Sequence, residues 1–188
     1  MRAFLAINLP PALQSQIHRD AEPLRAAAPL VTWVRRELLH FTVKFLGEIS
    51  AGHVNLIRST LGSVASTHHP FSMQLSGTGT FPNFHNPRVV WIGVKPHRTV
   101  FALAEDVEEA CELLGFERDA RGFSPHLTIG RVKRALSHAM AGALERAALA
   151  PRAEYVVDVE SLDLMRSDLT PTGPSYTVLA SMPLGARV

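Results

Sequence analysis

The sequence predicts an α+β fold made of two similar lobes, each an antiparallel sheet with helices on its outside. Short apolar runs rich in β-branched residues alternate with amphipathic segments. The order strand, helix, strand, strand, helix, strand is followed by a second, related series. The connections are short, except near residues 77–87. We therefore expect residues 1–188 to form a single domain of two interleaved lobes.

The first half of the chain alternates strands with helices. Residues 2–9 form a compact apolar run closed by Pro10, which is typical of a buried strand. Leu13 and Ile17 then begin a helical pattern behind the prolines, which suit a helix start. The stretch 77–87 is rich in Gly, Pro and Asn and is expected to be a loop. The other expected elements are helices at 11–28 and 50–66 and strands at 31–34, 38–46, 71–75 and 88–94.

The second half contains the clearest helix, which is expected over 97–114. Val100, Val107 and Cys111 lie on its apolar stripe, acidic residues cover the other face, and Gly115 is well placed as a C-cap. Cys111 is therefore expected in the core and not as a nucleophile. The remaining expected elements are strands at 124–132, 153–164 and 175–182 and a helix at 137–149.

Composition and charge exclude several classes of protein. Hydrophobic residues make up 46% of the chain and charged residues 19%, which is ordinary for a soluble domain. A net charge of +2 allows a local anion site but argues against a long duplex-binding surface. The single cysteine cannot form an internal disulfide, and no apolar run approaches the roughly 18 residues of a membrane span. We expect a cytoplasmic protein with no signal peptide and no membrane contact.

Two of the expected strands carry the same pattern, a histidine and a threonine two residues apart. The pairs are His40 with Thr42 and His126 with Thr128. Because residues i and i+2 of a strand point to the same side, each pair shares one face while its apolar neighbours point to the other. A third copy of the pattern, at 97–99, begins a helix and forms no such face. The repetition in strand context predicts a polar surface built from both pairs.

Two such pairs suit acid–base chemistry on a phosphodiester. Imidazole titrates near neutral pH, so one histidine can take a proton from water while the other protonates the leaving oxygen. The hydroxyls of Thr42 and Thr128 would bind non-bridging phosphoryl oxygens. Arg131 would neutralise the developing charge if a bulge or strand end near Gly130 turns it to the same face. This chemistry needs no metal, and the nine histidines show no zincin-type spacing, so no metal and no cofactor are expected.

Longer runs around both motifs, and several segments outside them, carry a family resemblance. These runs are 2–7, 39–48, 88–94, 123–131, 164–167 and 173–176, together with Trp33. On these residues the chain resembles the 2H phosphoesterase superfamily, and within it the RNA 2′,3′-cyclic phosphodiesterases also called 2′-5′ RNA ligases. The similarity covers nearly the whole chain. Gly130 departs from the pattern, because relatives often carry alanine there.

The resemblance implies a bilobal, pseudo-two-fold fold in which two antiparallel sheets face a central cleft. The cleft would receive both histidines and both threonines, with Arg131 as the phosphate-binding arginine. The implied reaction opens a terminal 2′,3′-cyclic phosphate of RNA or an oligonucleotide to a 2′-phosphate, and the related transesterification runs backwards as 2′-5′ ligation. Following the resemblance, His126 is expected to be the general base and His40 the general acid. We expect the enzyme to be a monomer.

Three further side chains and two other functions stay open. Phe45 and Phe123 are candidates for stacking a terminal base, but either is equally an ordinary core residue. Lys44 shares the expected strand parity of His40, so it would add positive potential to the site or lie on the surface.

The substrate is alternatively a small nucleotide or ADP-ribose cyclic phosphate, with the loop at 77–87 gripping or excluding an RNA strand. A non-catalytic RNA-binding module is the other alternative; the intact histidine pairs disfavour it, because arginine or lysine would serve binding alone.

Overall fold

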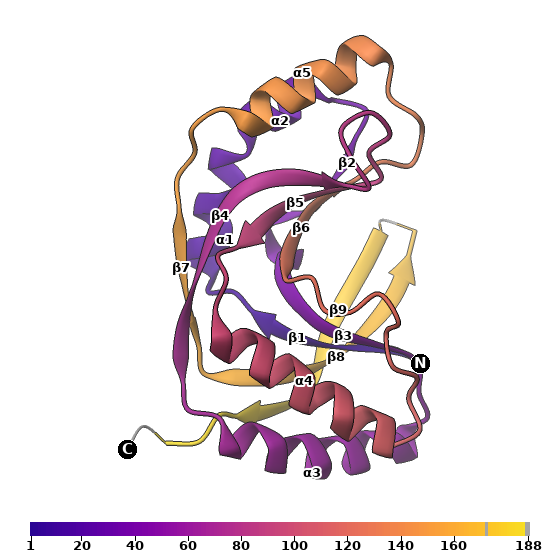
Figure 1. The fold of residues 1–188 in the computed structure, drawn as a ribbon. Coiled ribbons are helices and arrows are strands. Elements are labelled where there is room, and N and C mark those ends of the chain that lie inside the picture. The colour runs from indigo at the N-terminus through magenta and orange to yellow at the C-terminus, as the bar shows by residue number, and fades with distance from the viewer. Residues whose placement is uncertain (172, 187–188) are drawn as a thin grey trace.

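The chain forms two antiparallel sheets in a computed structural model that describes residues 1–171 and 173–186 (Figure 1). The first sheet has the strand order β3-β1-β8-β9, and the second has the order β2-β6-β5-β4-β7. The first sheet consists of β1 (Arg2–Asn8), β3 (His40–Glu48), β8 (Ser161–Thr170) and β9 (Gly173–Pro183). The second consists of β2 (Thr32–Trp33), β4 (Phe71–Phe81), β5 (Val89–Val94), β6 (His126–Arg131) and β7 (Tyr155–Val159). The predicted α+β class, with two antiparallel sheets, is confirmed.

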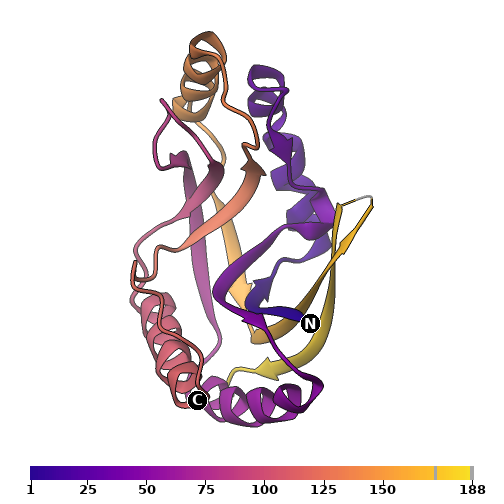
Figure 2. The ribbon, with the colours of Figure 1, turned by 90° about the vertical axis from the view of Figure 1, so that its right-hand side faces the viewer.

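Helices lie at both ends of the molecule, and α1 (Pro11–Asp20) lies between these ends. The others are α2 (Glu22–Ala27), the 3-10 turn η1 (Arg36–Leu38), α3 (Ala51–Thr67), α4 (Arg98–Leu113) and α5 (His138–Leu149). The pair α3 and α4 lies at one end and the pair α2 and α5 at the other, as Figures 1 and 2 show. One apolar core draws on both sheets and on the helices, including Leu5, Leu61, Leu75, Leu127 and Leu144. The two sheets therefore share a core.

Two expected elements are each divided in the structure. The helix expected over 11–28 breaks at Ala21 into α1 and α2, with Pro23 in the first turn of α2. Proline lacks the N–H that would continue the first helix, and its ring clashes with the carbonyl four residues earlier. The strand expected over 153–164 divides at Glu160 into β7 and β8, which belong to different sheets. Alternation alone cannot show that a chain crosses from one sheet to another.

The expected loop at 77–87 is wrong for residues 77–81, because β4 continues to Phe81, and is confirmed for residues 82–87. Gly77 adopts a positive φ of 71° where the pairing of β4 with β5 shifts register, so this glycine lets the strand bulge and continue. Gly79 lies directly beneath the indole of Trp91, and a Cβ there would collide with the ring. Within this strand Gly77 permits the bulge and Gly79 permits the close approach of Trp91. Only the turn at 82–88 remains as a connection.

Cys111 lies in the core, as predicted. Burial raises the pKa of its thiol to about 11, so the sulfur stays protonated at neutral pH and is a poor nucleophile. Among the described residues, no helix is both long enough and apolar enough to cross a membrane.

Candidate active site

The two histidine motifs lie on strands that meet where the two sheets come together. β3 is an edge strand of the first sheet, β6 belongs to the second sheet, and the two strands are in contact. His40 begins β3 and His126 begins β6. Both imidazoles are half-buried, as are Thr42 and Thr128. The fold therefore brings together two segments that are far apart in the sequence.

Each histidine is held by the same hydrogen bond. His40 Nδ1 lies 2.7 Å from the carbonyl oxygen of Leu38, and His126 Nδ1 lies 2.7 Å from that of Ser124. A carbonyl oxygen only accepts, so Nδ1 must carry the proton in both rings and donate it. Nε2 is then left to act on a substrate, as an acceptor when the ring is neutral and as a donor when it is charged. Both histidines are thus oriented for proton transfer at Nε2.

A bulge turns Arg131 to the face that carries His126 and Thr128. Thr128 pairs with Trp91 and Gly130 with Val90, which leaves Ile129 as an extra residue in β6. The bulge reverses the alternation, so the odd spacing between His126 and Arg131 no longer separates them. From the sequence, a role for Arg131 required a bulge or a strand end near Gly130. The structure places it one residue earlier.

A matching bulge in β3 corrects the expectation for Lys44. Thr42 pairs with Ala6 and Lys44 with Leu5, so Val43 is the extra residue. Lys44 is therefore turned away from the face of His40 and buried, with its Nζ 2.6 Å from Glu108 Oε1 and 2.8 Å from the carbonyl oxygen of Glu117. It is neither a surface lysine nor a source of free positive charge, because the ion pair neutralises it.

Phe45 takes the place on β3 that strict alternation would have given to Lys44. Its side chain is 66% exposed, and its ring centroid lies 6.1 Å from that of Phe4, which in turn packs against His40. Phe123 is placed differently. Its ring packs edge-on against Phe41, on the opposite side of β3 from His40, and against Phe101 of α4. These contacts favour a core role for Phe123 and leave Phe45 as the exposed aromatic ring beside the site.

The electrostatics of His40 link the two motifs. Burial lowers the pKa of this imidazole below its usual value, and the charge of Arg131 lowers it further, against the hydrogen bond to Leu38. An arginine of β6 therefore acts on a histidine of β3 across the junction of the sheets. In the free protein, His40 favours the neutral form at neutral pH.

Aromatic rings that the sequence analysis gave no role surround the histidines. His40 lies 4.8 Å from Phe4 and 5.1 Å from Tyr176 between ring centroids, and His126 lies 5.0 Å from Phe81 in an edge-to-face arrangement. Phe81 stands before a proline and Tyr176 follows the sequence Gly-Pro-Ser, so each is an aromatic residue beside turn residues. An aromatic residue next to a turn was the only signal in the sequence that could have pointed to these two rings. It does not show that either ring contacts a histidine.

The carboxylate of Asp163, which Asn8 links to the His40 strand, accepts three hydrogen bonds from neighbouring side chains. Asn8, the register partner of His40, donates to Asp163 Oδ2 at 2.7 Å, and the other oxygen of Asp163 accepts from Ser181 and Ser161. Among the described residues, no three His, Cys, Asp or Glu side chains form a cluster that could hold a metal ion. The metal-free chemistry expected from the sequence stays a prediction.

Comparison with known proteins identifies the family. A profile of the 2′-5′ RNA ligase superfamily matches residues 10–171. The chain belongs to this superfamily. A protein of Methanothermobacter thermautotrophicus named RNA 2′,3′-cyclic phosphodiesterase is 35% identical over 184 residues, covering 94% of this chain and 95% of its own.

Solved structures of the superfamily share the fold. TT0787 of Thermus thermophilus superposes with a TM-score of 0.78 at 27% identity, over 100% of both chains. Escherichia coli LigT in complex with 3′-AMP gives a TM-score of 0.77 at 27% identity, over 97% of both chains. A 2H phosphoesterase architecture is thus shown for this member of the superfamily.

Proposed function

We propose that this chain hydrolyses the terminal 2′,3′-cyclic phosphate of RNA to a 2′-phosphate, by acid–base catalysis between His40 and His126 without a metal. Cyclic phosphodiesterase activity is supported by superfamily membership and by relatives that carry that name. The observation that carries the mechanism is the matched pair of Nδ1 hydrogen bonds, which leaves both Nε2 atoms to exchange protons with a substrate. A module that only bound RNA would not require two imidazoles oriented in the same way.

The reaction is a single in-line displacement at phosphorus. His126 Nε2 takes a proton from water, and the water oxygen forms a bond to phosphorus. The bond between phosphorus and O3′ breaks, and His40 Nε2 gives its proton to O3′. The product carries a 3′-hydroxyl and a 2′-phosphate. With a 5′-hydroxyl in place of water, the same steps form a 2′-5′ linkage.

Threonine hydroxyls and one arginine hold the phosphate. Among the residues that the structure describes, neither Thr42 nor Thr128 has a hydrogen-bond partner for its hydroxyl, so both are available for non-bridging oxygens. Arg131 stabilises the charge that develops in the transition state. As a general acid, His40 must be protonated although burial and Arg131 lower its pKa. The anionic phosphate supplies the compensating charge when the substrate binds, because it attracts the imidazolium.

One assay tests this function. The purified chain is incubated in EDTA with a short oligoribonucleotide that ends in a 2′,3′-cyclic phosphate, and the terminal phosphate of the product is assigned by ³¹P NMR. We expect full turnover in chelator and a 2′-phosphate. Loss of activity in EDTA that a divalent ion restores would contradict the two-histidine mechanism, and a 3′-phosphate would overturn the regiochemistry.

A further inference from the structure

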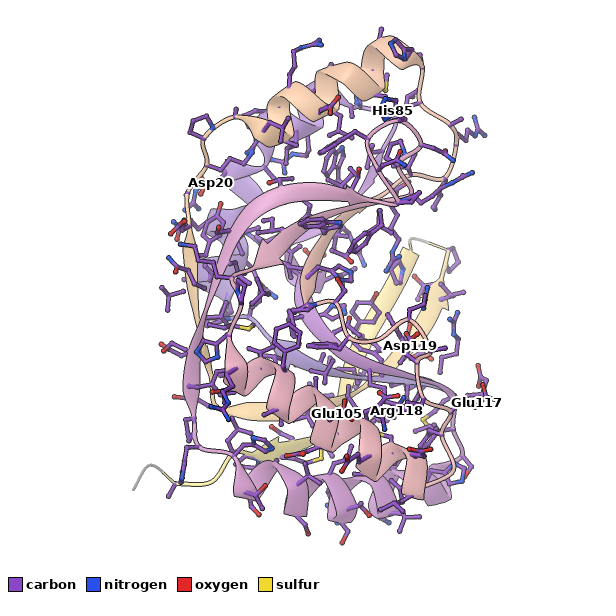
Figure 3. All side chains as sticks on the ribbon, viewed as in Figure 1. Asp20, His85, Glu105, Glu117, Arg118 and Asp119 are labelled. Carbon is purple, nitrogen blue, oxygen red and sulfur yellow. The ribbon has the colours of Figure 1, made fainter. Side chains whose placement is uncertain are left out.

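Acidic residues are absent from the strands that carry half of the site. Residues 49–104 and 120–144 contain no Asp or Glu, and these stretches include β4, β5 and β6. Figure 3 shows Glu105 on α4 and Glu117 and Asp119 after its C-terminal end, all away from His85 in the turn between β4 and β5. The turn between β4 and β5 and the segment after β6 therefore lie in stretches of the chain that contain no acidic residue.

Three exposed cations lie in these stretches, and we call Arg88, Lys133 and Arg134 the basic rim. The backbone N–H of Val132 donates to the carbonyl of Arg88 at 2.9 Å. The β4–β5 turn and the segment after β6 therefore lie side by side, as can be followed in Figure 1. Within the described part of the chain, no rim side chain has a hydrogen-bond or ion-pair partner. Their charges are unneutralised and face solvent.

Arg131 connects the basic rim to the candidate active site. It pairs with Val89, the residue after Arg88, and it stands two positions before Lys133. Two residues of chain span at most about 7 Å, so the backbones of Arg131 and Lys133 lie within about 7 Å of each other. That step is comparable to the one between successive phosphates of an extended nucleic-acid strand. Positive charge thus continues outward from the atoms proposed to hold the terminal phosphate.

We propose that the basic rim binds backbone phosphates of the nucleotides that precede the terminal cyclic phosphate of an RNA strand. The inference rests on the proposed function, which places the RNA end between His40 and His126. Lysine and arginine contacts to phosphates supply affinity that does not depend on sequence. A group of three cations suits a short single strand and agrees with a net charge of only +2, which is too low for a duplex-binding surface. The rim therefore favours an RNA strand over a mononucleotide with the same reacting end.

Two substrates with the same reacting group test the rim. One is 2′,3′-cyclic CMP, and the other is a short oligoribonucleotide that ends in the same cyclic nucleotide. In the triple variant Arg88→Gln, Lys133→Gln and Arg134→Gln, the ratio of kcat/KM for the oligonucleotide to that for the mononucleotide should fall about tenfold or more, through KM. The matched control is Arg58→Gln, an exposed arginine of α3 at the opposite end, which should leave the ratio unchanged. An equal loss on both substrates would overturn the proposal.

A binding measurement decides the same question without turnover. An oligoribonucleotide with a terminal 2′-phosphate is titrated with protein at several salt concentrations, and the dissociation constant is measured by fluorescence anisotropy. Each phosphate contact contributes about 0.7 to the slope of log affinity against log salt for single strands, so the triple variant should lose about 2 from the slope. An unchanged slope and affinity would contradict the proposal that the basic rim binds phosphates. If the wild-type protein cleaved neither substrate, the proposed function would fail, while this titration would still test phosphate binding by the rim.

Discussion

The two motif strands repeat one another up to the threonine and differ at the fifth residue after the histidine. On β3 that residue is Phe45, and on β6 it is Arg131. In both strands a bulge at the residue after the threonine, Val43 or Ile129, turns this position to the histidine face. One half of the site therefore ends in an aromatic ring and the other in a cation. The repeat supplies one imidazole to each half, and the position behind the bulge gives each half a different side chain.

The surroundings of the histidines differ as well. His40 packs against Phe4 and Tyr176, whereas His126 has Phe81 as its ring neighbour. Burial and the charge of Arg131 also lower the pKa of His40. For His40 the surroundings therefore raise the cost of carrying a charge, beyond what the hydrogen bond shared by both motifs sets.

The largest expected effect comes from removing either imidazole. His40→Ala and His126→Ala should each lower kcat by about 10³ or more, since general acid–base catalysis contributes roughly 10² to 10⁴ per group. The double variant should cost little more than one change, because the two histidines act in one displacement. Initial rates on the cyclic oligonucleotide measure this. Losses that multiply in the double variant would show that the histidines act independently.

A substrate in which sulfur replaces O3′ distinguishes the general acid from the general base. A thiolate leaves with little need for a proton, so this substrate should restore most of the activity of His40→Ala and little of that of His126→Ala. The comparison is the ratio of kcat on the sulfur and oxygen substrates for each variant and for the wild type. Rescue of His126→Ala instead would exchange the roles of acid and base.

Arg131→Ala should lower kcat/KM by about 10², or about 3 kcal/mol, if its contact strengthens in the transition state. Arg131→Lys should recover only part of the loss, because an ammonium lacks the planar fork that binds two phosphoryl oxygens. Steady-state kinetics on one cyclic substrate give both values. A wild-type rate for Arg131→Ala would show that the cation on β6 contributes nothing to the reaction, so that the difference between Arg131 and Phe45 would have no functional meaning.

Phe45→Ala should have a smaller effect, confined to binding. Stacking of a base on an aromatic ring is worth about 1 to 3 kcal/mol, and at this exposed site we expect the low end, about a fivefold rise in KM with kcat unchanged. Phe123→Leu is the matched control, because its ring packs on the far side of β3 and should not affect KM. Equal KM values for Phe45→Ala and the wild type would show that the terminal base does not stack there.

The smallest effect is a shift in the titration of His40. Arg131→Gln removes a positive charge that disfavours the imidazolium, so the pKa of His40 should rise. Burial remains the larger cause, so the value should stay below that of a free histidine. Imidazole proton NMR of the free protein measures the midpoint, and Arg58→Gln serves as the distant control. A downward or absent shift would mean that Arg131 does not reach across to β3.

Much of the architecture follows from local patterns in the sequence. The strict 3.6-residue stripe of α4 and the alternation around His40 and His126 placed these elements nearly at their observed bounds. Patterns failed where glycine or a crossover changed the path of the chain. Gly77 and Gly79 continue β4 where turn residues predicted a loop, and Glu160 sends the chain from one sheet to the other. Such positions depend on neighbouring strands that a local pattern does not contain.

The sequence by itself determined the class of chemistry, the strand faces of both His-x-Thr pairs and the family, because side-chain alternation and residue type are local properties. Only the tertiary structure decided the direction of Lys44, Phe45 and Arg131, since a bulge arises from pairing between strands. It also decided the Nδ1 hydrogen bonds of the histidines and the aromatic rings against them. Pairing register and distant contacts are set by the whole core, so the position five residues after each histidine could not be placed until both sheets were assembled.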